Sequence, residues 1–312
     1  MGSNLKTKRV FNYKNDEDSR RLVSDFVGNT PFVQLSDKIY AKLESVNPGG
    51  SIKDRPVKWI IDHAERNDLL KPNDTIIEAT SGNTGIALAM IGAERNYNIK
   101  IVMPCDMSEE RKMLLKMFGA ELIEVPEGDF EQAITLKDEI AEQEGYFSLN
   151  QFNNPLNIEC HYKTTFKELL NHSLTIGKYI SAFISGTGTG GTIMGVQKGF
   201  SEFDTRVKMI AVEPAESPVM SGGEKGLHGI QGIGDGSQFL VDLDKIDEIL
   251  TISTEDAKSR CKSLALENGL LVGISAGANI LAAERWVEKN NPPGIVFTIL
   301  CDRGERYSSM LY

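Results

Sequence analysis

Segments typical of buried strands alternate with segments typical of helices along most of this chain. Short apolar runs that predict strands lie at residues 39–44, 75–79, 99–104, 121–125, 146–150, 179–185, 207–212 and 295–301. Stretches that predict helices lie at residues 85–95, 108–119, 130–144, 189–200, 254–268 and 277–289. Alternation of this kind predicts an α/β fold whose sheets are mainly parallel and covered by helices on both faces.

The alternation falls into two parts that meet near residues 145–165. We therefore expect two α/β regions, residues 1–150 and residues 151–312. A long glycine-rich stretch without regular periodicity, from Pro214 to Leu240, interrupts the second region, and loops of this length usually carry function. Clefts in parallel α/β folds open at the carboxyl ends of the strands, so motifs at those ends are candidate sites.

The composition argues against several classes of protein. The chain has 312 residues and a net charge of −10, and it has neither a basic block nor an apolar run long enough to cross a bilayer. Nucleic acid and membranes are therefore not expected partners. The four cysteines form no C-x-x-C, the four histidines have no metal-ligand spacing, and residues 1–4 begin no signal peptide. These features predict a cytoplasmic protein with reduced cysteines and no metal site.

A lysine follows a tight turn in the segment Asn47-Pro48-Gly49-Gly50-Ser51-Ile52-Lys53-Asp54-Arg55. The proline and the two glycines favour the turn, and Ser51 is suited to cap the helix that follows. Lys53 would then lie near a helix N-terminus, where the backbone dipole and Arg55 make loss of its proton easier. Such a lysine is suited to imine formation with a carbonyl compound. The alternative is an ordinary exposed lysine in a first helical turn.

Three other polar turns lie between an expected strand and an expected helix. The turn Thr80-Ser81-Gly82-Asn83-Thr84-Gly85 offers hydroxyl, amide and backbone N–H donors to a small carboxylate, or is simply a polar turn. The turn Gly186-Thr187-Gly188-Thr189-Gly190-Gly191-Thr192 is typical of a phosphate-binding loop. The turn at 273–277 contributes the hydroxyl of Ser275, and Gln151 adds an amide at the end of another strand.

The loop at 186–191 also matches the dinucleotide-binding pattern G-x-G-x-x-G, and Glu213 ends the next expected strand. An NAD-dependent oxidoreductase is therefore an alternative of another class. The spacing to Glu213 is long for that pattern, and the threonines of the loop suit a monophosphate.

Together these motifs resemble the cysteine synthase (O-acetylserine sulfhydrylase) family of pyridoxal-phosphate enzymes, fold type II, which is related to cystathionine β-synthase. The resemblance runs from about Gly28 to Tyr307. It is carried by segments 28–31, 47–55, 80–85, 103–108, 151–152, 161–162, 186–192, 211–214, 232–234, 273–277 and 304–307. It implies two three-layer α/β domains with pyridoxal 5′-phosphate in the cleft between them, and a homodimer. The smaller, mobile domain would span about 44–150, the larger phosphate-binding domain 151–312, and the segment of about 13–43 would cross between them.

The resemblance also implies roles for single residues. Lys53 would form the imine with the cofactor and move the α-proton of the substrate. The other cofactor contacts would be Asn83 at the phenolic oxygen, Ser275 at the pyridine nitrogen, and Gly188, Thr189, Gly190, Gly191 and Thr192 at the phosphate. The substrate, a three-carbon amino acid, would be bound by Thr80, Ser81, Thr84 and Gln151 at its carboxylate and by Gly232. The implied chemistry is β-elimination or β-replacement through an aminoacrylate, catalysed by a lyase or transferase.

Asp235, in Gly232-Ile233-Gly234-Asp235-Gly236, departs from the family pattern, which commonly has alanine there. A carboxylate at this place would repel bisulfide and accept a proton from water. We therefore expect conversion of L-cysteine and water to L-serine and hydrogen sulfide, with Asp235 activating the water.

Several alternatives to this reaction remain open. Asp235 is equally suited to a turn between glycines, in an ordinary cysteine synthase that makes L-cysteine from O-acetylserine or O-phosphoserine and sulfide. An amine nucleophile is a related possibility, and a non-catalytic protein that keeps the fold is another. The segment at 301–303 resembles the broader-specificity branch of the synthases, and Arg303 and Glu305 are expected to be solvated.

Overall fold

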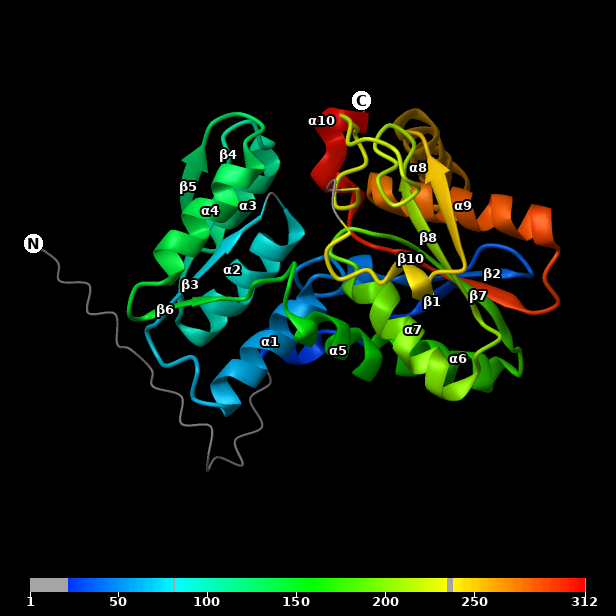
Figure 1. Cartoon of the computed structure of the whole chain (residues 1–312), viewed down its shortest axis with the longest axis horizontal. Coiled ribbons are helices and arrows are strands. Elements are labelled where there is room, and N and C mark those ends of the chain that lie inside the picture. Colours follow the sequence, from blue (N-terminus) through cyan, green and yellow to red (C-terminus); the bar gives the residue numbers. More distant parts are fainter. Residues whose placement is uncertain (1–21, 81, 235–237, 312) are drawn as a thin grey trace, which may run out of the picture.

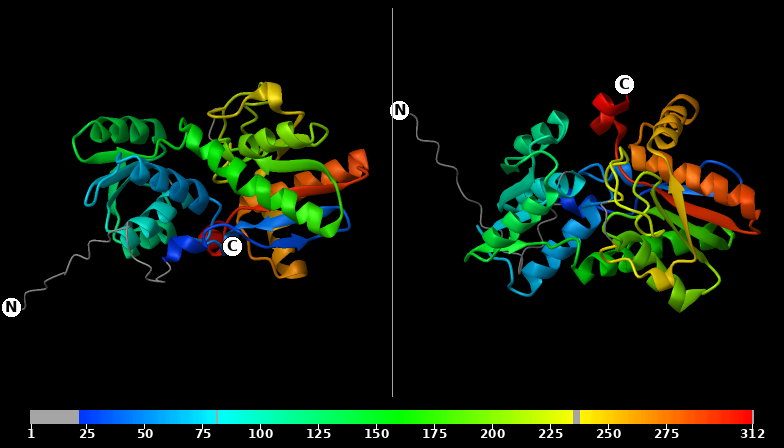
Figure 2. Two further views of the ribbon diagram at one scale, coloured as in Figure 1. Left: turned by 90° about the horizontal axis from the view of Figure 1, so that it is seen from below. Right: turned by 45° about the horizontal axis from the view of Figure 1, so that its top comes forward.

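The computed structural model describes residues 22–80, 82–234 and 238–311. The chain forms two α/β lobes that lie side by side (Figure 1). Figure 2 shows the same two lobes from two further directions. Each lobe contains one sheet with helices on both faces.

The smaller lobe is built on a four-stranded parallel sheet in the order β5-β4-β3-β6. Its strands are β3 (Thr75–Ala79), β4 (Asn98–Pro104), β5 (Glu121–Val125) and β6 (Tyr146–Ser148). Its helices are α1 (Asp54–Arg66), α2 (Asn83–Arg95), α3 (Glu109–Met117) and α4 (Phe130–Ala141). Ile76 packs with α1, α2 and α3 on one face of the sheet, and its neighbour Ile77 packs with α4 on the other. This division follows from the alternation of side chains along a strand.

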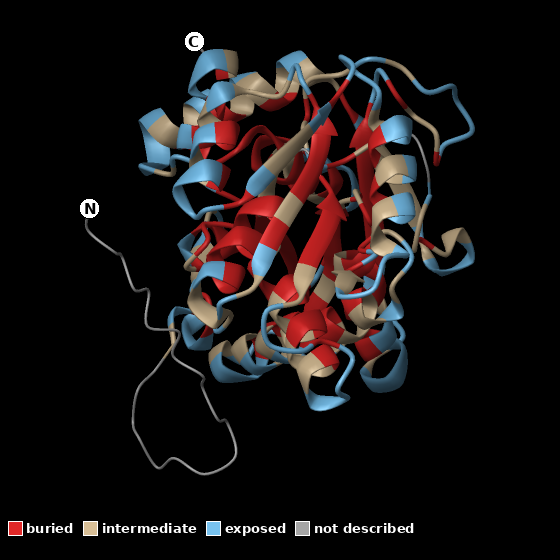
Figure 3. Ribbon diagram, turned by 90° about the vertical axis from the view of Figure 1, so that its left-hand side faces the viewer, coloured by how far each residue is buried: buried red, intermediate tan, exposed pale blue. Residues whose placement is uncertain are grey.

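The larger lobe is built on a six-stranded sheet in the order β1-β2-β10-β7-β8-β9. Its strands are β1 (Phe32–Gln34), β2 (Ile39–Leu43), β7 (Ile180–Gly186), β8 (Lys208–Pro214), β9 (Glu248–Ile252) and β10 (Ile295–Leu300). Only β1, among the described strands, pairs antiparallel to its neighbour. Every residue of the central strand β10 is buried, as expected for a parallel strand covered on both faces. Figure 3 shows buried strands flanked by helices with exposed outer surfaces.

The helices of the larger lobe are α5 (Pro155–Lys163), α6 (Thr165–Ile176), α7 (Gly191–Phe203), α8 (Thr254–Asn268) and α9 (Ile274–Asn290). Helices α8 and α9 cover one face of the sheet, and α6 and α7 cover the other with α5 beside them. Short helical turns complete the chain at η1 (Val23–Phe26), η2 (Glu44–Val46), η3 (Leu243–Lys245), η4 (Gly304–Tyr307) and α10 (Ser308–Leu311).

Strands β1 and β2 come from the segment expected to cross to the other domain and lie in the large sheet, where β2 pairs with β10. Some other elements differ from the sequence prediction. Helix α1 begins at Asp54 with Lys53 as its N-cap residue, so Ser51 lies two residues before the cap position. Strands β1 and β9 and helices α5 and α6 were not predicted from the sequence.

Candidate active site

Lys53 lies where the turn after β2 meets the end of β10. The N–H of Ile52 donates to the carbonyl of Cys301 at 2.9 Å, and Ser51 forms a β-bridge with Asp302. The hydroxyl of Ser51 accepts the N–H of Lys53 at 3.2 Å, so it stabilises the turn instead of capping the helix. The N-terminal end of α1, with Lys53, is thereby fixed against the large sheet.

A cavity at this place brings together most of the residues that the sequence predicted for the cofactor. It is lined by the strand ends of β7 and β10, the loop before α7, the start of α9 and the loop at 231–233. Of the predicted residues, its lining contains Lys53, Asn83, Gly188, Thr189, Gly190, Thr192, Gly232 and Ser275. Gly191, Thr80, Thr84 and Gln151 lie outside this lining, and Ser81 and Asp235 lie outside the described residues.

The loop before α7 has the geometry of an anion-binding site. Among the described residues, the backbone N–H groups of Gly188, Thr189 and Gly190 have no hydrogen-bond acceptor. Gly190 has φ +87°, and a Cβ there would lie 2.6 Å from Val241 Cγ2. A Cβ on Gly191 would collide with the side chain of Asn157. Only glycine fits at positions 190 and 191, and the N–H groups of this loop at the start of a 13-residue helix suit a phosphate.

The rest of the lining suits an aromatic ring with a polar atom at each end. Ser275 is buried in the first turn of α9, and its hydroxyl can donate to or accept from a ring nitrogen. Burial raises the pKa of the Cys301 thiol to about 12, so this neighbour stays uncharged. The residues present therefore fit pyridoxal 5′-phosphate, with the phosphate at the glycine loop and Ser275 and Asn83 at the ring.

Asn83 is held by residues that the sequence did not single out. Its amide nitrogen donates to Asp302 Oδ2 at 2.7 Å, and its carbonyl oxygen accepts from Arg306. Asp302, Arg306 and Tyr307 are buried, whereas Arg303 and Glu305 are exposed as expected. The run of charges directly after a buried strand was the available signal for this cluster.

The residues predicted to bind the substrate carboxylate form a second group beside the phosphate loop. The hydroxyl of Thr84 donates to Gln151 Oε1 at 2.7 Å. The amide of Asn157 donates to the carbonyl of Gln151 and to the hydroxyl of Thr189, both at 3.0 Å. Asn157 thus links this group to the phosphate loop, and no motif in the sequence pointed to it.

Arg55 belongs to a buried ion network that anchors α1. Its guanidinium donates to Glu44 Oε1 and Oε2, both at 2.7 Å, and to Glu168 at 2.6 and 2.8 Å. Lys42 lies 2.5 Å from Glu168 in the same network. Although burial opposes the shift, Arg55 holds the pKa of Glu44 below its ordinary value. Two carboxylates therefore balance the charges of Arg55 and Lys42, and the network fixes the start of α1 in place.

Glu213 has a structural role at the end of β8. It is buried and accepts hydrogen bonds from the N–H groups of Met220 and Ser221, at 2.8 and 3.0 Å, and from the Ser221 hydroxyl at 2.5 Å. Both of its carboxylate oxygens are used to hold the loop that follows β8. The dinucleotide pattern therefore lacks its acidic partner.

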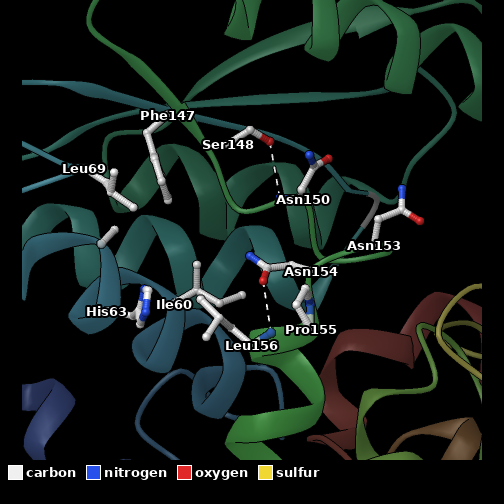
Figure 4. A pocket seen from close by; sticks show the side chains of 11 residues that line it. Ile60, His63, Leu69, Phe147, Ser148, Asn150, Asn153, Asn154, Pro155 and Leu156 are labelled. Carbon is white, nitrogen blue, oxygen red and sulfur yellow. Dashed lines mark hydrogen bonds between the residues drawn. The ribbon is translucent and has the colours of Figure 1, made fainter. Parts of the chain in front are cut away.

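A second pocket lies between α1, β6 and the start of α5 (Figure 4). Its lining is mostly apolar, with Ile60, Leu69, Phe147 and Leu156, and the side chain of His63 faces it. No residue predicted for the cofactor or the substrate contributes to this pocket.

Comparison with known proteins identifies the family. The family model described as "Pyridoxal-phosphate dependent enzyme" matches residues 23–302. The chain belongs to this family. The predictions of pyridoxal 5′-phosphate as cofactor, of the fold class and of an enzyme of the cysteine synthase family are thereby confirmed.

Three relatives show the range of the similarity. A cysteine synthase of Staphylococcus aureus (strain Mu50) is 42% identical over 298 residues, which cover 92% of this chain and 95% of the relative. The crystal structure of O-ureido-L-serine synthase has a TM-score of 0.88 at 38% identity and covers 94% of this chain and 95% of that one. A hydrogen sulfide-producing enzyme of Fusobacterium nucleatum, solved as an aspartate-to-asparagine variant with an α-aminoacrylate intermediate, has a TM-score of 0.88 at 37% identity. That match covers 92% of this chain and 90% of the other.

Two further observations concern metals and membranes. Within residues 22–80, 82–234 and 238–311, no group of three or more His, Cys, Asp or Glu side chains is arranged to hold a metal ion. Over the same residues, every helix is too short or too polar to span a bilayer.

Proposed function

We propose that this enzyme eliminates or replaces the β-substituent of a three-carbon amino acid, and that its main reaction converts L-cysteine and water to L-serine and hydrogen sulfide. The observation that carries the proposal is the convergence of Lys53, the phosphate loop and Ser275 on one cavity. The family supports the general chemistry, and the carboxylate of Asp235 supports the specific reaction.

Each lining residue has a role in this proposal. When bound, pyridoxal 5′-phosphate supplies an electron sink that makes the α-proton acidic and allows the β-substituent to leave. Lys53, which lines the cavity, would hold the cofactor through its amine and would serve as the base for the α-proton of the substrate. The N–H groups of Gly188, Thr189, Gly190 and Gly191 and the hydroxyl of Thr192 hold the phosphate.

Ser275 favours elimination over transamination. A hydroxyl cannot fully protonate the ring nitrogen as a carboxylate does, so the electron sink is weaker and loss of the β-substituent is preferred. Asn83 would donate its second amide hydrogen to the cofactor, since the first is donated to Asp302. Thr80, Ser81, Thr84 and Gln151 bind the substrate carboxylate.

Asp235 would act on the water. The loop around it supports this role, because Gly232 and Ile233 line the cavity and the N–H of Gly234 donates to the carbonyl of Thr187 at 2.9 Å. In this reaction Lys53 would take the α-proton and the sulfur would leave as bisulfide. A water oxygen would then bond to the β-carbon while Asp235 accepts the water's proton, and Lys53 would return a proton to the α-carbon. A hydrogen sulfide-producing relative whose intermediate was captured in an aspartate-to-asparagine variant further supports an aspartate in this step.

A second candidate is synthesis of L-cysteine from O-acetylserine or O-phosphoserine and sulfide. The 42% identity to a cysteine synthase favours it. Asp235 would then be a turn residue.

The test is product analysis with L-cysteine for the parent and for Asp235→Asn. We expect serine formation to fall by about a hundred-fold in the variant, as for loss of a general base, while the visible absorbance of the bound cofactor is kept. Asp242→Asn is the matched control, since Asp242 forms a surface ion pair with Lys245. This variant should leave the rate of serine formation unchanged. Serine production at the parental rate in Asp235→Asn would show that the proposed role is wrong.

Offering each substrate separately distinguishes the two reactions. A cysteine synthase would form L-cysteine from O-acetylserine or O-phosphoserine and sulfide faster than it forms serine from cysteine. We also infer a cytoplasmic homodimer, on the family resemblance and the cysteine usage, and light scattering of the purified enzyme tests the oligomeric state.

A further inference from the structure

The peptide that follows β10 connects the two lobes on the side where α10 lies. Figure 1 and the right panel of Figure 2 show α10 between the lobes. Residues 302–308 of this peptide contact both lobes through buried polar groups, and the proposed function assigns Asp302 and Arg306 no contact with cofactor or substrate.

On one side this peptide is fixed to the large lobe. The N–H of Gly273 donates to the carbonyl of Asp302 at 3.1 Å. The N–H of Gly304 donates to the carbonyl of Leu271, also at 3.1 Å. The side chains of Tyr307 and Leu311 pack into the hydrophobic core that includes α9. The hydroxyl of Tyr307 donates to Asp302 Oδ2 at 2.5 Å, which orients the carboxylate.

On the other side the same peptide holds the small lobe. Asp302 accepts from the amide of Asn83, the first residue of α2, at 2.7 Å. Arg306 donates both to the carbonyl oxygen of Asn83 and to the backbone carbonyl of Gly49, in the turn before Lys53. Two weaker contacts to the start of α3 accompany them: Arg111 lies 5.3 Å from the ring centre of Tyr307, and Ser308 lies 3.4 Å from Glu110.

These contacts determine how the amide of Asn83 is oriented. A side-chain amide has one oxygen acceptor and two N–H donors. Arg306 occupies the oxygen and Asp302 takes one N–H, so the second N–H remains for the cofactor. Asp302 is fully buried, and its Oδ1 has no hydrogen-bond partner among the described residues. Withdrawal of Asn83 would therefore leave a buried carboxylate with even fewer partners, which is costly.

We propose that Asp302 and Arg306 form a clamp that holds the start of α2 and the turn before Lys53 against the large lobe and orients Asn83 toward the cofactor. Both are positioning residues that act through Asn83 and Gly49. The role of Asn83 rests on the proposed function, whereas the clamping of the two lobes does not. Loss of the clamp lowers the fraction of molecules in the binding-competent arrangement, so it raises the apparent KM more than it lowers kcat.

Hydrogen–deuterium exchange of the cofactor-free and cofactor-loaded protein tests the clamp without any substrate. In Arg306→Met we expect exchange in peptides covering 47–53 and 83–95 to rise by about ten-fold, the size expected for loss of a charged hydrogen bond, while β7 and β8 are unchanged. Arg260→Met is the matched control, because Arg260 donates to Glu284 at 2.7 Å between α8 and α9, within the large lobe. It should leave exchange in both peptides at the parental level.

Unchanged exchange in 47–53 and 83–95 would overturn the proposal, and so would an equal rise in β7 and β8, which indicates only a loss of global stability. If Arg306→Met does not fold, Arg306→Lys decides by the same criterion, since lysine keeps the charge but cannot bond two acceptors in the arginine geometry. Because exchange needs no substrate, the clamp can be confirmed even if serine formation is not observed.

Discussion

The side-chain amide of Asn157 donates a hydrogen bond to the hydroxyl of Thr189 at 3.0 Å, and its other hydrogen reaches the carbonyl of Gln151 at the same distance. Thr189 belongs to the phosphate loop, and Gln151 to the proposed substrate site. The same side chain packs against Gly191 so closely that no Cβ fits there. A single buried asparagine therefore fixes the distance between the two ends of the site.

We predict that Asn157→Leu weakens retention of the cofactor by about ten-fold and lowers the free energy of unfolding by about 1–3 kcal/mol, because two buried acceptors lose their donor. Dialysis followed by absorbance measures retention, and urea denaturation measures stability. Asn154→Ala is the control, since Asn154 only caps α5 and bonds Leu149. Equal cofactor loss in both variants would contradict a specific role for Asn157.

Replacing Lys53 by alanine should remove the cofactor's visible absorbance band and reduce turnover of L-cysteine by about a thousand-fold, because the covalent attachment and the proton carrier are lost together. The fold should persist, since the side chain lines a cavity. Lys58→Ala is the matched control on the same helix, where Lys58 pairs with Asp62 at 2.5 Å. A Lys53→Ala protein with the parental spectrum would refute the assignment.

Glu213→Gln should destabilise the protein by about 2–3 kcal/mol, because an amide nitrogen replaces one of two charged oxygens that accept from Met220 and Ser221. We expect faster proteolysis within residues 214–234, the described part of the loop that Glu213 holds. Denaturation and a timed digest measure the two effects. If Glu213 instead bound a ribose, the variant would keep its stability and lose affinity for NAD.

Glu78 makes the stability depend on pH. Burial raises its pKa from 4.5 to about 7, against the opposing effects of Lys137 and of backbone N–H groups. The folded protein thus keeps a proton between about pH 4.5 and 7 that the unfolded chain releases, so stability falls as the pH rises through this range. Burial shifts Asp54 in the same direction, also to about 7.

Urea denaturation between pH 5 and 8 should show this decline in the parent and a flatter profile in Glu78→Gln, whose side chain does not titrate. The N–H of Asn150, which donates to Glu78 at 2.9 Å, keeps an acceptor oxygen in the variant. A profile as steep in the variant as in the parent would assign the pH dependence to other groups.

Local patterns were sufficient to predict many elements and the cofactor loop. The strand at 75–79 and the helix at 254–268 have the predicted bounds, because apolar periodicity and turn residues agree there. The glycine loop was recognisable because its geometry is encoded within seven consecutive residues. Helices α5 and α6 were missed, although Asn154 as N-cap and Pro155 as the first helical residue mark the start of α5.

Contacts between distant residues could not be predicted in the same way. The partners Asn83 and Asp302 are 219 residues apart, and Arg55 and Glu168 are 113 apart. In its local sequence, each of these residues is typical of a polar residue near the end of a helix or strand. Only the fold shows that these four side chains meet their partners in buried places, where an unpaired charge would be costly.

The pairing of β2 with β10 has a consequence for synthesis of the chain. Residues 39–43 pair with residues 296–300, so the large sheet lacks a central strand until residues 296–300 have emerged from the ribosome. The small sheet draws all its strands from residues 75–148 and needs nothing made later. We therefore expect the small lobe to fold first during translation. Strand β2 would then remain without its partner β10 until β10 is synthesised.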